Sequence, residues 1–183
     1  MKKIRTIAAM ALLTLSASAQ KLAKVNFSEL VQLMPEADKA RETMAAASKE
    51  ADDTYKTMVE EFQGKYQAYQ QKASTWTPSI KESKERELSD MQQRIQDFQQ
   101  SVSQELQDQQ TALMAPIYQK AQEEVQKIAK NLGIDIVFDA STALYYSDSI
   151  IDLTADARKA LNVPAGRTLE SLQQELAAQQ QQQ

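Results

Sequence analysis

Two long runs of regularly spaced apolar residues, separated by one proline-containing break, constrain the fold of this 183-residue chain more than any other feature. Across residues 37–76 an apolar side chain recurs about every 3.5 positions, and the pattern resumes over residues 88–132. This is the period of helices that pack along one seam. The break lies at residues 75–78, where Pro78 disfavours helical geometry at the residue before it. The pattern predicts two long helices that form an antiparallel hairpin.

The tight turn also predicts which apolar residues face each other across the hairpin. Folding the chain at the break places Phe62 opposite Ile95 and Met44 opposite Leu113. About forty helical residues, at about 1.5 Å each, give an arm about 60 Å long.

Two residues predict how the second helix is shaped and where it ends. Pro116 removes one helical hydrogen bond and crowds the preceding turn, so we expect a kink there. Gly133 directly follows the last apolar residue of the run and suits the left-handed conformation that ends a helix.

The composition excludes several function classes. Only three Gly and four Pro residues disfavour an all-β sandwich or barrel, which needs frequent turns. The absence of His and Cys excludes a Ser-His-Asp triad, a Cys-His pair and a zinc site. The remaining candidates are adjacent carboxylates, namely Asp52-Asp53, Glu60-Glu61 and Glu123-Glu124. Neighbouring residues on a helix point about 100° apart. We therefore expect these pairs to be a solvated surface, and we predict no enzyme activity, catalytic residue, metal or cofactor.

The first nineteen residues have the pattern of a secretory signal peptide. Three basic residues precede an apolar segment at residues 6–16, and the small residues 17–19 match a cleavage site. The apolar segment is too short to span a bilayer. We therefore expect cleavage after Ala19 and an exported, unanchored chain. Its 18 Lys and Arg against 25 Asp and Glu give a net charge of −7, which disfavours nucleic-acid binding.

The two ends of the chain together predict one small β-containing body. Residues 23–27 alternate as a short strand, and a short helix capped by Ser28 follows and stops at Pro35. Near the other end, we expect Thr154 to cap a helix that continues to about Val163.

Alternation over residues 134–139 predicts a second strand, and residues 142–146 are a further β-prone run. Because only Ala140-Ser141 connects the two runs, we expect them to form a β-hairpin.

The predicted fold class is mostly α with a small β body from which the helical hairpin projects. The expected organisation is a signal peptide at 1–19, a body from 20–36 and 118–163, an arm at 37–117 and a flexible Gln-rich tail at 164–183, with a weak amphipathic turn or two at Leu169, Leu172 and Leu176. Such a body has too little core to be stable alone, so we expect a homo-oligomer. The candidate oligomerisation residues are Val25, Phe27, Ile134, Ile136 and Phe138.

This order of parts resembles the Skp/OmpH family of periplasmic chaperones over the whole mature chain. The resemblance is carried by residues 23–27 (AKVNF), 113–117 (LMAPI) and above all 131–139 (NLGIDIVFD). It implies a jellyfish-like trimer, in which three arms project from a shared β body around a cavity. It also implies that the cavity holds unfolded outer-membrane proteins without ATP. The negative charge disfavours tight capture of lipopolysaccharide or anionic lipid, so we expect at most weak contact with a membrane surface.

The leading functional hypothesis is therefore an ATP-independent holdase in the periplasm. The alternative is a coiled-coil spacer or adaptor of the cell envelope, which shares the arms but needs no open cavity. Most apolar arm residues, such as Met58 and Met91, are expected to fill the seam. Trp76 and Tyr118 are the candidates for client contact, with a cap over the turn as the other interpretation of Trp76.

Overall fold

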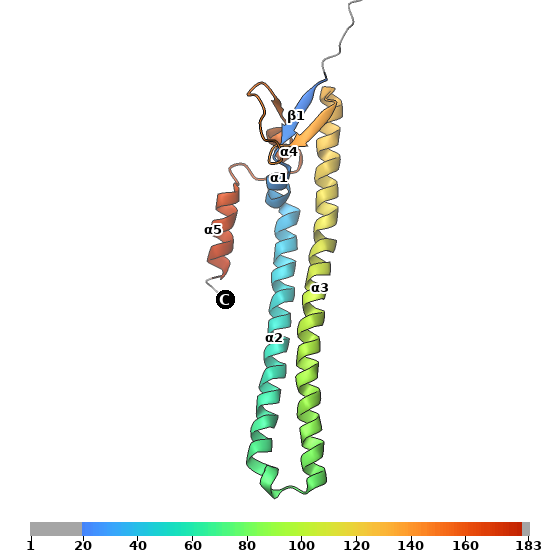
Figure 1. The fold of residues 1–183 in the computed structure, drawn as a ribbon. Coiled ribbons are helices and arrows are strands. Elements are labelled where there is room, and N and C mark those ends of the chain that lie inside the picture. The colour runs from blue at the N-terminus through green and yellow to red at the C-terminus, as the bar shows by residue number, and fades with distance from the viewer. Residues whose placement is uncertain (1–19, 181–183) are drawn as a thin grey trace, which may run out of the picture.

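The computed structural model describes residues 20–180, and the expected signal peptide lies outside the described residues. The molecule is a long helical hairpin with a small body at one end (Figure 1). Helices α2 (Pro35–Lys72) and α3 (Pro78–Leu132) run side by side in opposite directions. The predicted antiparallel hairpin, and the mostly helical fold class with a small sheet, are therefore confirmed.

The turn at the far end of the hairpin forms where proline predicted it. Helix α2 gives way to a short 3₁₀ segment, η1 (Ala73–Thr75), and α3 begins at Pro78. The Thr77 hydroxyl accepts a hydrogen bond of 3.5 Å from the backbone N–H of Ile80. Proline at the first helical position loses no helical hydrogen bond, so Pro78 is a favourable first residue for α3.

Helix α3 continues without interruption through Pro116, and the kink expected there stays a prediction. The helix ends at Gly133, whose φ of 64° is left-handed, as the sequence predicted. The N–H of Ile134 then bonds to the carbonyl of Ala129 at 2.9 Å. This contact satisfies a helix-end carbonyl and keeps Ile134 out of the strand that follows.

A three-stranded sheet lies at the end of the hairpin opposite the turn. Strand β1 (Leu22–Val25) is central, with β2 (Ile136–Asp139) on one side and β3 (Ile151–Asp152) on the other. Both neighbours are parallel to β1. The parallel arrangement requires long crossovers, and the hairpin arm itself is the crossover between β1 and β2.

The predicted hairpin between residues 134–139 and 142–146 is wrong. Residues 142–146 form a loop, and β2 pairs with β1 instead. The side-chain carboxylate of Asp139 accepts a hydrogen bond from the Ser141 N–H at 3.0 Å. The backbone carbonyl of Asp139 accepts one from the Thr142 N–H at 3.1 Å. This turn leads the chain away from β2 before a second strand can pair with it.

Two short helices complete the body, and both differ slightly from expectation. Helix α1 (Phe27–Leu33) begins one residue before the expected cap, Ser28. Helix α4 (Thr154–Ala160) is shorter than predicted, and Thr154 does not cap it. The Thr154 hydroxyl instead accepts a hydrogen bond of 3.0 Å from the Asn26 N–H, which joins α4 to the end of β1.

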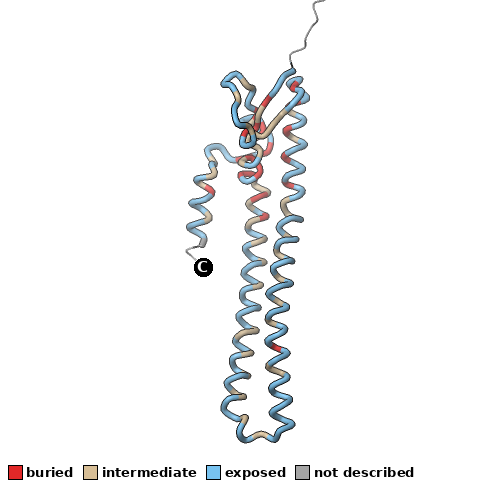
Figure 2. Tube along the Cα trace, in the orientation of Figure 1, coloured by how far each residue is buried: buried red, intermediate tan, exposed pale blue. Residues whose placement is uncertain are grey.

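The core lies in the body and in the nearest turns of the arm (Figure 2). It continues past the body through Ala40 of α2 and Ile117 of α3. The largest fully buried side chains are Leu30, Leu33, Met34, Leu153, Leu161 and Val31. Within residues 20–180, no helix is both long and apolar enough to cross a membrane.

The expectation of a flexible tail is corrected for residues 169–180. They form helix α5 (Leu169–Gln180), which lies beside the base of the arm. Thr168 and Ser171 exchange backbone-to-side-chain hydrogen bonds of 3.0 and 3.1 Å at its start. Leu172 is only 5% exposed, so this helix is part of the core.

Candidate functional site

The arm exposes most of its surface, because two helices alone cannot enclose a core along their length. Within residues 20–180, Met91 is the one apolar residue of the distal arm that is buried. Phe62 and Tyr66 stack with ring centroids 6.1 Å apart, yet Tyr66 remains 45% exposed. Tyr55 and Ile80 are exposed to a similar degree. The arm therefore presents half-buried aromatic and aliphatic side chains among polar ones.

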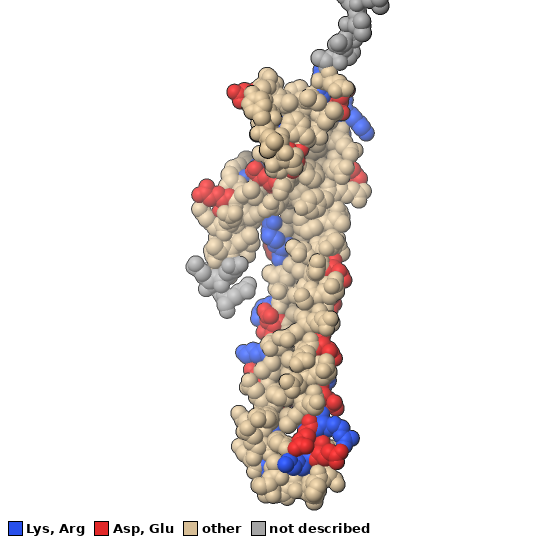
Figure 3. Space-filling model, in the orientation of Figure 1, with Lys and Arg blue, Asp and Glu red and all other residues tan. Residues whose placement is uncertain are grey.

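Basic and acidic side chains gather on the surface near the far end of the arm (Figure 3). Lys65 of α2 pairs with Glu87 of α3, and Lys84 bonds to the other oxygen of Glu87 at 2.7 Å. Hydrogen bonds from both lysines lower the pKa of Glu87 to about 2. The Tyr69 hydroxyl donates to Glu85, which raises the pKa of Tyr69.

A second ion pair joins the helices at the base of the arm, between Glu36 and Lys120. The lysine hydrogen bond lowers the pKa of Glu36. Polar pairs thus join α2 and α3 at both ends of the hairpin. The predicted apolar partners, Phe62 with Ile95 and Met44 with Leu113, stay a prediction.

The two candidate client-contact residues lie at opposite ends of the arm. Trp76 is half-buried at the turn and makes an edge-on contact with Tyr69, with ring centroids 5.9 Å apart. This contact supports its interpretation as a cap over the turn. Tyr118 lies near the body, where its ring is 6.2 Å from that of Phe27 and 47% of the residue is exposed.

The five candidate oligomerisation residues divide between two surfaces. Residues paired across neighbouring strands share a face of the sheet, so Leu22 and Ile136 lie on the same outer face as Phe138. Leu22 is 41% exposed and Ile136 is 49% exposed. Val25 points to the opposite face and is buried within the protomer.

The remaining two candidates also pack within the protomer. Ile134 is buried, and Phe27 is half-buried against the core. The sequence suggests one continuous apolar strand face, whereas among the five candidates only Ile136 and Phe138 lie on the outer face of the sheet. Successive side chains of β1 point to opposite faces of the sheet, so Val25 points inward. Ile134 belongs to the end of α3 and not to the strand.

A polar cluster completes the outer face of the sheet. The ammonium of Lys24 lies 3.3 Å from the Asp152 carboxylate and 4.0 Å from the ring centroid of Tyr146. Although partial burial opposes the change, hydrogen bonds from Thr154 and Lys24 keep the pKa of Asp152 below its ordinary value. The ring of Tyr146 also lies 6.3 Å from that of Phe138.

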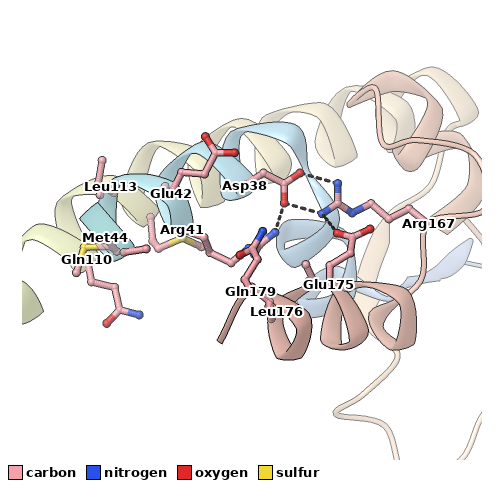
Figure 4. A pocket seen from close by; sticks show the side chains of 14 residues that line it. Asp38, Arg41, Glu42, Met44, Gln110, Leu113, Arg167, Glu175, Leu176 and Gln179 are labelled. Carbon is pink, nitrogen blue, oxygen red and sulfur yellow. Dashed lines mark hydrogen bonds and ion pairs between the residues drawn. The ribbon is translucent and has the colours of Figure 1, made fainter. Parts of the chain in front are cut away.

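Two further surfaces are not predicted from the sequence. Leu144 and Tyr145, expected in a strand, lie in the loop after Thr142 and are almost fully exposed. The second surface is a groove of about 650 Å³ between α5 and the base of the arm (Figure 4). The spacing of Leu169, Leu172 and Leu176 is the sequence signal for the helix that forms one wall.

The adjacent carboxylates gather into no metal site. No group of three such side chains within residues 20–180 is placed to hold a metal ion. Instead, Asp53 pairs with Lys49 at 3.1 Å and Glu61 with Lys65 at 3.4 Å along the exposed helix surface.

Comparison with known proteins gives consistent relationships. A family model described as "Outer membrane protein (OmpH-like)" matches residues 21–161. The chain is 30% identical over 144 residues to Chaperone protein Skp of Yersinia enterocolitica, covering 79% of this chain and 87% of that protein. It is 29% identical over 142 residues to Chaperone protein Skp of Pectobacterium atrosepticum, covering 78% and 86%.

A solved structure shares the fold. The crystal structure of an outer membrane chaperone described as OmpH-like, from Caulobacter crescentus, matches with a TM-score of 0.69 at 12% identity. The match covers 78% of this chain and 84% of the other.

Proposed function

Because the chain belongs to the OmpH-like family of outer membrane proteins, we propose that it is an ATP-independent holdase chaperone of the periplasm. Its clients are unfolded outer-membrane proteins, held in a cavity between helical arms. The observation that carries this proposal is the arm, whose apolar side chains stay half-exposed along a hairpin of 38- and 55-residue helices. The names of its two Skp relatives support the same function.

Unfolded-protein binding of this kind needs many weak contacts rather than one specific pocket. Exposed rings such as Tyr55 and Tyr66 offer apolar area along the arm, and methionines add flexible, polarisable contacts. A client that touches several arms gains from the high effective concentration of each further contact. Such binding is reversible, and no nucleotide is needed to reset it.

The cavity requires more than one arm, so the proposal includes a homo-oligomer, a trimer as in the family the sequence resembles. The outer face of the sheet supports this part, because Leu22 and Ile136 leave apolar surface exposed beside Phe138. Val25, Phe27 and Ile134 contribute indirectly, by holding the sheet on the protomer core.

The proposed location is the periplasm, reached by a signal peptide that is cleaved after Ala19. The pattern of basic, apolar and small residues over 1–19 supports it. The mature net charge of −7 favours neither nucleic acid nor anionic lipid as a partner, so any contact with a membrane surface is weak.

The test is to remove the distal arm. In the variant, residues 60–98 are replaced by a copy of the turn sequence 75–78, and this shortened chain is compared with the full mature chain. Light scattering follows aggregation of an outer-membrane β-barrel diluted from urea, without nucleotide. We expect the full chain to suppress aggregation and the shortened chain to lose this effect while keeping its native mass. Equal protection by both would contradict the cavity mechanism and favour the envelope spacer.

A further inference from the structure

The hydrogen bonds that join helix α5 to the arm lie at its start. Arg167, just before the helix, donates two hydrogen bonds of 2.6 Å to the carboxylate of Asp38 in the first turn of α2. Leu172, in the first half of α5, is buried in the core. Farther along α5, Arg167 pairs with Glu175 at 3.5 Å, and Leu176 is half-buried against the core.

The groove lies beside the end of α5, and both of its walls carry apolar side chains among charged and polar ones such as Arg41 and Gln179 (Figure 4). Leu176 lines it from α5, while Met44, Leu113 and Met114 line it from the arm. All four side chains are half-buried. Moving the end of α5 toward the arm would remove their exposed surface from water, which is favourable.

Helix α5 follows the part of the chain that the family model matches. The family match ends at residue 161, whereas α5 begins at Leu169. The helix therefore lies outside the residues that the family model matches, and it packs beside the base of the arm.

We propose that α5 is a hinged strap, anchored through Arg167 and Leu172, whose distal half closes over Met44 and Leu113 at the base of the arm. The occupant of the groove is therefore α5 itself. A consequence that rests on the proposed holding function is that the strap competes with unfolded clients for this apolar surface. In this proposal the structure, with its open groove, is the open state of α5, and the state in which α5 covers the groove is the closed one.

The movement can be measured without any client, because the chain has no native cysteine. Spin labels at Ser48→Cys and Ala178→Cys, both exposed positions outside the groove lining, report the distance between arm and strap. We expect two distance populations, and Leu176→Gln should remove the shorter one. Ala177→Gln, at an exposed position of the same helix that does not line the groove, is the matched control and should keep both. A single narrow distance that Leu176→Gln leaves unchanged would overturn the strap.

The competition is tested by adding an unfolded outer-membrane β-barrel to the same labelled proteins. We expect the barrel to deplete the shorter distance. Leu176→Gln should bind the barrel about two- to threefold more tightly, which corresponds to a closed state held by about one half to two thirds of the molecules. If the barrel is kept soluble but neither the distances nor the affinity change, the competition is wrong and the holding function stands. If the barrel aggregates in every sample, the holding function fails, and the distances measured without client still decide whether the strap exists.

Discussion

The carboxylate of Asp38 accepts a hydrogen bond from each terminal nitrogen of Arg167, 129 residues later in the chain, at 2.6 Å in both cases. Both side chains are largely shielded, at 17% exposure for Arg167 and 27% for Asp38. The two-pronged geometry suits the planar guanidinium and cannot be reproduced by an ammonium group. The contact thereby joins the segment before α5 to the first turn of the arm.

Arg167→Lys should lower the free energy of unfolding by about 1–2 kcal/mol, because one of two charge-assisted hydrogen bonds is lost. Urea denaturation at fixed protein concentration, followed by circular dichroism, measures this change. The matched control is Arg86→Lys, whose partner Glu82 is 72% exposed, and it should cost less than about 0.5 kcal/mol. Equal costs for the two variants would show that the Asp38 contact adds no stability beyond that of a surface pair.

Ile136→Asp should separate the oligomer without unfolding the protomer. Ile136 is 49% exposed in the protomer, so a carboxylate there stays in water until a second subunit covers it. Burial in an interface would then cost several kcal/mol. Val25→Asp is the contrasting variant, since Val25 is 3% exposed and its replacement should unfold the body itself. Sedimentation together with circular dichroism distinguishes the two, and an intact oligomer of Ile136→Asp would refute the proposed interface.

The distal arm should loosen in acid because of Glu87. Its pKa of about 2 in the folded arm lies below the ordinary value of 4.5, so its ion pairs stabilise the fold fully above about pH 4.5. That contribution decreases as the pH falls toward 2. Trp76, the only tryptophan, lies near this network and reports on it by fluorescence. Glu87→Gln should reduce the change in Trp76 fluorescence between pH 5 and pH 2. If the pH profile of this variant matches that of the unsubstituted protein, other carboxylates cause the change.

The register of the hairpin is open to a direct crosslinking test. Cysteine pairs at Phe62 with Ile95 and at Met44 with Leu113 should oxidise within one subunit, with no background from native cysteines. The measurement is the shift on a non-reducing gel. Efficient crosslinking only at pairs displaced by a full helical turn would show that the predicted register is wrong.

The features predicted correctly from the sequence are those that depend on neighbouring residues. The spacing of apolar residues determines the two helices, Pro78 determines where the second begins, and Gly133 supplies the left-handed end. Each acts within a few positions of itself. The hairpin is therefore predictable from local sequence patterns alone.

The features that are predicted wrongly depend on partners far along the chain. The pairing of Leu22 with Ile136 competes with the local hairpin suggested by residues 142–146, and only the tertiary fold decides between them. The contact between Asp38 and Arg167 leaves no pattern in the sequence, so the segment that forms α5 resembles a tail. The exposure of Ile136 could not be predicted from the sequence either. An alternating pattern shows which residues share a face of a strand, but not which face the rest of the protein covers.

No single side chain should be essential for holding clients, because the proposed binding is spread along the arm. Trp76→Ala and Tyr118→Ala should each weaken the affinity for an unfolded β-barrel by less than about fivefold, since each loses one contact among many. The double variant should lose roughly the product of the two effects, because the residues lie at opposite ends of the arm. Fluorescence anisotropy of a labelled barrel, diluted from urea, measures the affinity at low and high salt. With a net charge of −7 on the mature chain, we expect little loss of affinity as salt rises. A steep loss with salt, or complete loss of binding from either single substitution, would contradict distributed apolar holding and indicate one specific site.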